Sequence, residues 1–143
     1  MVMIGAHQKT VAKIDGLIIV RNGYMVLESY NHLLEPHFKH QIYSCTKSLT
    51  SALLGIAIEQ GFVVDEHELM YGYFEDHGME HLSEGKQSVT LWHLLTMSAG
   101  FEWYELEYPY GDERNTFYNF VRSSDRVQFV LDRPMSADPG TEY

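Results

Sequence analysis

The sequence predicts an α+β fold, and three observations support that prediction. Two strand-like runs flank an Asn-Gly turn near the start of the chain, and a long apolar run follows over residues 44–60. Short segments with helical periodicity occupy the later chain. With 143 residues and 45% hydrophobic content, the chain is large enough to bury a substantial core. We expect one domain over residues 1–143, with a hairpin and a helix in residues 1–60 and a mainly helical region in residues 61–143.

The first element is a predicted β hairpin. Residues 17–20 and 24–30 are rich in β-branched, apolar and aromatic side chains, and Arg21-Asn22-Gly23 joins them. An Asn-Gly pair between two such runs is the strongest short-range signal of a hairpin. The run at residues 17–20 shows little alternation, so we expect that strand to be covered on both faces. An isolated hairpin is only marginally stable in water, so both strands should belong to a larger sheet.

The second element is a predicted helix over residues 44–60. Apolar side chains recur every three to four residues, at Leu49, Leu53 and Ile56, which is the pattern of a buried amphipathic helix. Gly61 stands where a left-handed cap would end this helix.

A serine and a lysine lie one turn apart at the start of this helix. Ser44 and Lys47 should share one face, because residues three apart are neighbours on a helix surface. A serine hydroxyl becomes a good nucleophile when a neighbouring base takes its proton, and lysine can be that base where burial lowers its pKa. Free N–H groups at a helix N-terminus can stabilise an oxyanion. The pattern indicates Ser44 as nucleophile and Lys47 as activating partner, against the alternative of an N-cap serine and a solvated lysine.

Two further features bear on this interpretation. Ser83 and Lys86 repeat the Ser-x-x-Lys spacing, but in a polar, glycine-broken segment where we expect nothing to be desolvated. Cys45 should point about 100° away from Ser44 around a helix, so we interpret it as a small buried hydrophobe and not as the nucleophile.

The later chain is predicted to hold several short elements. Residues 62–65 are expected to be extended, and residues 89–97 to form a helix that begins at a Thr90 cap and stops at Gly100. Two short amphipathic helices are expected at residues 115–122 and 124–131.

Aromatic residues gather between residues 101 and 120. We expect most of them to pack between elements, with Trp103 and Tyr104 as the candidates for lining a pocket. His93, on the predicted second helix, is expected to be packed or hydrogen-bonded and not to act as a base.

A different chemistry is open at residues 77–81. His77 and His81 with Glu80 match the His-x-x-Glu-His pattern of inverted zinc peptidases. Two histidines four apart could bind zinc if the segment were helical. Gly78 and two nearby glycines weaken a helix there, so we favour a solvated loop and expect no metal or other cofactor.

Charge and composition exclude several classes of partner. The net charge of −10 divides into +1 over residues 1–60 and −11 over residues 61–143, which argues against nucleic acid or an anionic membrane surface. No apolar run approaches the roughly 20 residues of a membrane span, so we expect a cytoplasmic protein without one. The single Cys45 excludes an internal disulfide and fits a reducing compartment.

Several fragments now form an ordered set. The chain carries, in order, Asp15-Gly16-Leu17, Arg21-Asn22-Gly23, Tyr43-Ser44-Cys45-Thr46-Lys47-Ser48-Leu49, His93-Leu94-Leu95-Thr96-Met97-Ser98-Ala99-Gly100-Phe101 and Pro139-Gly140-Thr141. This set resembles the β-lactamase-related serine hydrolases, a group with class C β-lactamases, penicillin-binding proteins, esterases and amide hydrolases. The resemblance implies an antiparallel sheet flanked by helices, with a helical region inserted into it.

The resemblance also implies roles for residues. Ser44 would be acylated by an ester, amide or β-lactam, Lys47 would help to activate it, and the Ser44 backbone N–H would form half of an oxyanion hole. A non-catalytic relative that binds peptide-like ligands in the same cleft is the alternative.

Some parts of the family pattern are not in these residues. The resemblance places a catalytic tyrosine about two residues beyond Tyr143, and a third motif and the remaining strands later still; Ala99 replaces a usual serine or threonine. We therefore expect residues 1–143 to be the N-terminal portion of such an enzyme, inactive or nearly so alone, and to self-associate through unpaired sheet edges.

Overall fold

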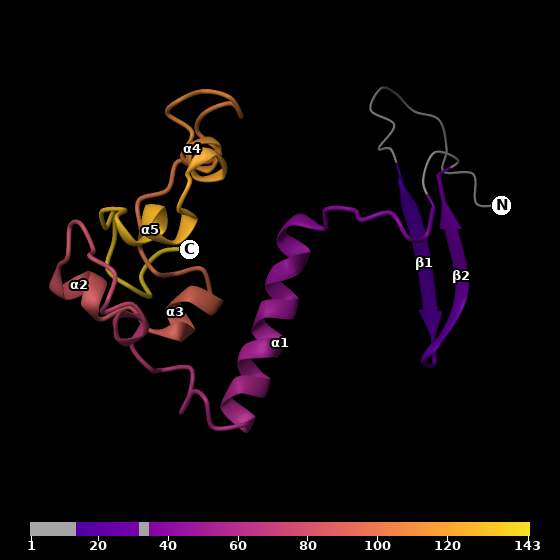
Figure 1. Cartoon of the computed structure of the whole chain (residues 1–143), viewed down its shortest axis with the longest axis horizontal. Helices are drawn as coiled ribbons and strands as arrows, with labels where there is room; N and C mark the ends of the chain where they lie inside the picture. Colours follow the sequence, from indigo (N-terminus) through magenta and orange to yellow (C-terminus); the bar gives the residue numbers. More distant parts are fainter. Residues whose placement is uncertain (1–13, 32–34) are drawn as a thin grey trace. The chain divides into compact units, whose positions relative to one another are not determined.

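The computed structural model describes residues 14–31 and 35–143 (Figure 1). The chain consists of two compact units, Met1–Tyr43 and Ser44–Tyr143. The first unit contains a two-stranded antiparallel sheet and the second contains helices, which agrees with the predicted α+β composition. The boundary between the units lies directly before Ser44, whereas the sequence predicts a division of the single expected domain after residue 60. The expected single domain over residues 1–143 stays a prediction.

The first unit is the predicted hairpin. Strand β1 (Gly16–Arg21) pairs with β2 (Tyr24–Tyr30) in an antiparallel register that runs from Gly16 opposite Tyr30 to Arg21 opposite Tyr24. The turn residues Asn22 and Gly23 have φ angles of 51° and 79°. Positive φ at both central positions is what a type I′ hairpin turn requires, which explains the Asn-Gly pair.

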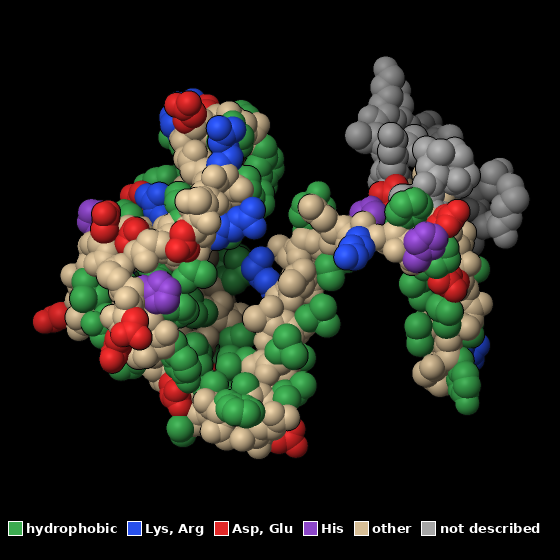
Figure 2. Space-filling view, in the orientation of Figure 1, with side chains coloured by type: hydrophobic (Ala, Val, Ile, Leu, Met, Phe, Trp, Pro, Cys, Tyr) green, Lys and Arg blue, Asp and Glu red, His purple; other side chains and the backbone are tan. Residues whose placement is uncertain are grey.

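The apolar residues of the hairpin are exposed on both faces. Ile18 and Ile19 point to opposite faces of the strand and are 53% and 45% exposed. Figure 2 shows hydrophobic side chains along the surface of this hairpin. The expectation that β1 is covered on both faces is wrong for the described residues, because their sheet contains only these two strands.

The second unit begins with the predicted long helix. A 3₁₀ turn, η1 (Tyr43–Cys45), leads into α1 (Thr46–Glu59), so the α-helix starts two residues after Ser44. Gly61 has a φ of 75°, and the N–H of Phe62 donates to the Ala57 carbonyl at 2.9 Å. This left-handed cap at Gly61 confirms the predicted end of the helix.

Helix α1 presents its apolar stripe to solvent. Leu49 and Leu53 are 58% and 65% exposed, and none of the α1 residues, all of which the structure describes, is buried. The predicted stripe exists, but the prediction that it is buried is wrong. Periodicity fixes which side chains share a face, whereas burial needs a second apolar surface on that face.

The rest of this unit consists of short helical segments, which are η2 (Met70–Tyr73), α2 (Glu84–Gln87), α3 (Leu91–Leu95), α4 (Thr116–Arg122) and α5 (Arg126–Leu131). Each α segment begins with a side chain that accepts a hydrogen bond from a backbone N–H three residues on; these caps are Ser83, Thr90, Asn115 and Asp125. Such caps satisfy N–H groups that a helix start leaves free, and they fix where short helices begin.

The predicted short helices exist with some corrected limits. Thr90 is the cap of α3 as predicted, but the helix ends at Leu95, and the first left-handed residue after it is Met97 with a φ of 57°. Gly100, the predicted stop, is also left-handed but lies in the next segment. Residues 62–64 form bends and residue 65 has no regular structure, so the prediction of an extended segment at residues 62–65 is wrong.

The core of the second unit lies among these short helices. Met70, Val89, Ala99 and Leu131 are buried, and Phe101 and other apolar side chains pack against them. No helix in the part of the chain that the structure describes has the length and apolar character needed to cross a membrane.

Candidate active site

Ser44 and Lys47 are hydrogen-bonded to each other. The Lys47 Nζ donates to the Ser44 Oγ at 3.0 Å. The η1 turn places Ser44 directly before α1, and Lys47 is the second residue of that helix. The two side chains therefore lie on the same face of this helical segment. The distance between them is one over which a proton can pass from the hydroxyl to a neutral amine.

The alternative role of Ser44 as an N-cap is not what the structure shows. The residue at the N-cap position of α1 is Cys45, and no side chain caps this helix. The Ser44 hydroxyl is bonded instead to the Lys47 amine. The first N–H groups of α1 stand at the same end of the helix, where donors lack intrahelical partners.

The surroundings of the pair differ from the expectation. Both side chains are exposed, so the described residues do not provide the dry environment that the sequence argument requires around Lys47. Cys45 is exposed as well, so the prediction that it is a buried hydrophobe is wrong. The cause is the same as for the exposed stripe of α1, because no described residue buries this helix.

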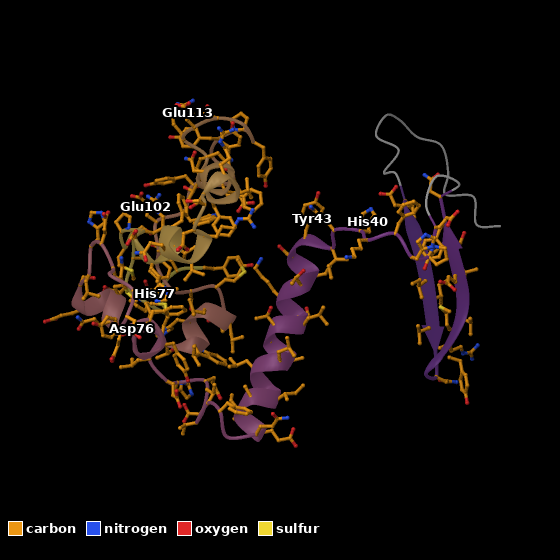
Figure 3. All side chains as sticks on the ribbon, in the orientation of Figure 1. His40, Tyr43, Asp76, His77, Glu102 and Glu113 are labelled. Atoms are coloured by element: carbon orange, nitrogen blue, oxygen red, sulfur yellow. The ribbon has the colours of Figure 1, made fainter. Side chains whose placement is uncertain are left out.

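The backbone directly before Ser44 is strained. Tyr43 has a φ of 45°, in the left-handed region that bulky residues rarely adopt, and Figure 3 places it at the start of α1. Such a conformation costs on the order of 1–3 kcal/mol, and these outliers cluster at functional sites. The strained residue belongs to the same 3₁₀ turn as Ser44, whose hydroxyl accepts from Lys47.

The second Ser-x-x-Lys tetrad has the opposite environment from the one predicted. Ser83 Oγ accepts from the backbone N–H of Lys86 at 3.1 Å and so caps α2. Lys86 is 0% exposed, and its Nζ donates to the carbonyl oxygens of Glu80 and Leu131. The expectation that nothing is desolvated here is wrong, because the segment folds against the end of α5. Yet Ser83 and the Lys86 amine are not bonded to each other, so this tetrad is structural.

The proposed zinc motif lacks its helix. His77 and His81 lie in irregular chain between η2 and α2, and His81 has a φ of 52°. Figure 3 shows His77 in this loop beside Asp76. Among the described residues, no group of three or more His, Cys, Asp or Glu side chains could hold a metal ion. The geometric premise of the zinc interpretation therefore fails.

The two candidate pocket residues have different surroundings. Trp103 packs edge-on against Phe120 and Phe129, with ring centroids 5.8 and 6.4 Å apart. Its Nε1 donates to Glu105 at 3.0 Å, so this side chain belongs to an aromatic cluster. Tyr104 is half-exposed, and the negative charge of Glu102, to which it donates a hydrogen bond, raises the pKa of Tyr104.

An open apolar cavity of about 300 Å³ lies elsewhere in the second unit. Its lining comes from η2, α3, α4, α5 and nearby residues, and includes Phe74, Leu94 and Val130. Neither Trp103 nor Tyr104 is among the residues that line it.

Two sequence fragments far apart in the chain are joined by hydrogen bonds. The N–H groups of Ser136 and Gly140 donate to the carbonyls of Gly100 and Ser98, both at 2.8 Å. His93 packs against Gly140, where an added β-carbon would lie 3.2 Å from the His93 Nε2. The His93 Nδ1 accepts from the Thr90 N–H at 3.1 Å, so the prediction of a packed, hydrogen-bonded histidine is confirmed.

Sequence reasoning did not find this pairing. Its two partners are the fragments around residues 93–101 and 139–141, whose order was the only signal available. Gly100 and Gly140, both left-handed, are the residues that could have indicated close backbone contact.

Comparison with known proteins identifies the family of the chain. The sequence model of the Beta-lactamase family matches residues 8–143, so the chain belongs to the Beta-lactamase family. No curated protein matches the chain. The family match supports a transpeptidase-like fold and a hydrolase of the serine type.

Proposed function

We propose that the protein is a serine hydrolase that forms an acyl-enzyme on Ser44, with Lys47 as activating partner. The hydrogen bond of 3.0 Å between the Lys47 Nζ and the Ser44 Oγ is the observation that carries this proposal. Membership of the Beta-lactamase family and the strained φ of Tyr43 next to Ser44 support it. The substrate class is an ester, an amide or a β-lactam.

The chemistry follows from the pair. A neutral Lys47 amine accepts the Ser44 proton as Oγ attacks the carbonyl carbon, and the carbonyl oxygen becomes an oxyanion. The backbone N–H of Ser44, in the turn before α1, and the free N–H groups at the start of α1 stabilise this negative charge. The intermediate then expels the alcohol, the amine or the β-lactam nitrogen, which takes up a proton. Water hydrolyses the resulting Ser44 ester and regenerates the hydroxyl.

The proposal requires that the pair be covered during the reaction. A general base must be neutral to accept a proton, and exclusion of water favours the neutral form of an amine. Lys47 is exposed in the described residues, so bound substrate or further protein must exclude water from it.

The exposure of this pair favours a second candidate function, a non-catalytic relative that binds peptide-like ligands. In that case Ser44 and Lys47 would be a hydrogen-bonding surface for a ligand, and neither would react.

Covalent labelling separates the two functions. The full-length protein is incubated with a fluorescent penicillin or a fluorophosphonate, and the labelled residue is identified by mass spectrometry. A serine hydrolase gives a label on Ser44 that Ser44→Ala removes, whereas Ser51→Ala, an exposed serine on the same helix, keeps it. Ligand binding without any covalent adduct at Ser44 would instead favour the non-catalytic relative.

A further inference from the structure

Lys86 is a buried lysine in a chain that leaves its catalytic candidate exposed. Its side chain is 0% exposed, and it lies in the short helix α2 beside core residue Val89. Lysines almost never bury fully unless their charge is paired, because an unpaired ammonium loses its hydration. The structure must therefore supply partners for this amine.

Two backbone carbonyls supply them. The Lys86 Nζ donates to the Glu80 carbonyl at 2.6 Å and to the Leu131 carbonyl at 2.8 Å. Leu131 is the last residue of α5, where carbonyls lack intrahelical donors and carry the negative end of the helix dipole. The ring of Phe101 lies 6.0 Å from the amine. One side chain thus joins α2, the loop before it and the end of α5.

A second set of hydrogen bonds joins the same loop to α5 and its C-cap residue. Asp132, the C-cap residue of α5, accepts at one carboxylate oxygen from the N–H of Glu80 at 2.9 Å and from Gln128 at 2.8 Å. Gln128 also donates to the carbonyl of Gly78. Residues 78–80 are therefore joined to α5 and its C-cap by these bonds as well as through the Lys86 amine.

The charges around the amine are mixed. Burial lowers the pKa of Lys86 below its usual range, and the charge of Arg133 acts in the same direction. The carboxylates of Asp132 and Glu80 act the other way. The carbonyl bonds do not require a charged amine, since a neutral amine can still donate two hydrogen bonds.

We propose that the Lys86 amine acts as a latch, that is, a hydrogen-bonded link which holds the loop at residues 78–80 and helix α2 against the end of α5. When these bonds break, the loop and α2 separate from α5 together, as one local unfolding unit. Opening breaks the bonds to Glu80 and Leu131 and exposes the amine, so access of a reagent to Lys86 reports the state of the latch. This inference is independent of any role of Ser44.

Amine acetylation of the intact protein tests the latch. A short pulse of an acetylating reagent is followed by mass spectrometry, which compares Lys86 with the exposed Lys39 and Lys47. We expect Lys86 to react at least about tenfold more slowly than Lys39, because only the open state is reactive. Its lowered pKa would by itself make Lys86 the more reactive amine, so slow acetylation must reflect occlusion.

A matched pair of substitutions tests the cooperativity. Gln128→Ala removes the bonds to Asp132 and to the Gly78 carbonyl and changes no charge near the amine, so it should raise the acetylation rate of Lys86 several-fold without changing that of Lys39. Gln41→Ala, at an exposed glutamine outside these bonds, should change neither rate. If Gln128→Ala does not fold, Gln128→Glu also removes both donors; its added carboxylate favours the charged amine and would slow acetylation, so a faster rate still reports opening. Equal acetylation of Lys86 and Lys39 in the unchanged protein, or an unchanged Lys86 rate in the Gln128 variant, would overturn the proposal.

Discussion

Gly100 lies so close to Ala137 that a β-carbon at position 100 would be 2.3 Å from the Ala137 carbonyl oxygen. The φ of Gly100 is 81°, which also disfavours any residue with a side chain. The contact is between backbones, so neither side can move aside as a flexible side chain would. It joins the segment after α3 to the segment after α5.

Gly100→Ala should therefore destabilise the second unit strongly, by about 2–4 kcal/mol, because steric overlap adds to the backbone strain. Urea unfolding followed by circular dichroism measures this. Gly111→Ala is the matched control: its φ is 104°, but nothing lies within 4 Å of an added β-carbon. That variant should lose only about 1 kcal/mol. Equal losses in the two variants would show that the Ala137 contact has no energetic effect.

Much of the local structure could be predicted from the sequence, because local chemistry determines it. Asn22-Gly23 specifies the hairpin turn through its positive φ angles, and Thr90 and Gly61 mark helix limits through capping. The Ser44–Lys47 contact is also determined locally, because residues three apart on one helical turn are neighbours.

Burial could not be predicted in the same way. Lys86 is buried because the Leu131 carbonyl, 45 residues later in the chain, accepts its hydrogen bond. Nothing in the polar sequence around Lys86 indicates that partner. The apolar stripe of α1 shows the opposite error, because it is predicted to be buried and is exposed. Leu49 and Leu53 form the expected pattern, but the pattern does not specify which surface covers it.

Lys47→Met should slow acylation of Ser44 by about 10²–10⁴-fold, the usual contribution of a positioned acid–base group. The measurement is made on the full-length protein, as the rate at which a fluorophosphonate, which reacts with the same Ser44 hydroxyl, labels it at saturating reagent. Lys39→Met, an equivalent change at an exposed lysine outside the pair, serves as control and should leave the rate unchanged. Labelling that proceeds at the original rate without the Lys47 amine would exclude its role as base.

Asn115 should be the most sensitive of the helix caps. Its side chain is fully buried, accepts from the Tyr118 N–H at 2.9 Å and donates to the carbonyls of Glu105 and Tyr108. Asn115→Ala leaves these groups without partners and should cost about 2–4 kcal/mol of unfolding free energy in a urea titration.

Asn115→Asp separates the two functions of this side chain. It keeps a cap acceptor for the Tyr118 N–H but replaces the two donors by a carboxylate facing carbonyl oxygens. If capping alone mattered, the aspartate variant would be as stable as the original protein. We expect it to be nearly as unstable as the alanine variant.

Asp112 should titrate far below an ordinary aspartate. Hydrogen bonds from the Arg114 side chain, and one from its backbone, lower the pKa of Asp112 from 3.8 to about 2. A lowered pKa in the folded state means that the pair contributes stability above about pH 3.8, which is lost as the pH falls through about 2. Carboxyl carbon shifts in an NMR titration give the pKa directly. Arg114→Gln should move it back towards 3.8, and an unchanged value would remove the ion pair as the cause.

The exposed apolar hairpin should cause self-association. Side chains on both faces of β1 and β2 are exposed, and within residues 14–31 and 35–143 the sheet has two strands, whose outer edges can pair with a second molecule. We expect light scattering after size exclusion to show species larger than a monomer, with a mass that falls on dilution. Val20→Lys places a charge in β1 and should shift the distribution towards monomer. Val64→Lys adds the same charge at an exposed residue outside the sheet and should not, so a response to both variants would point to net charge and not to the hairpin. A monodisperse monomer at all concentrations would contradict association through this surface.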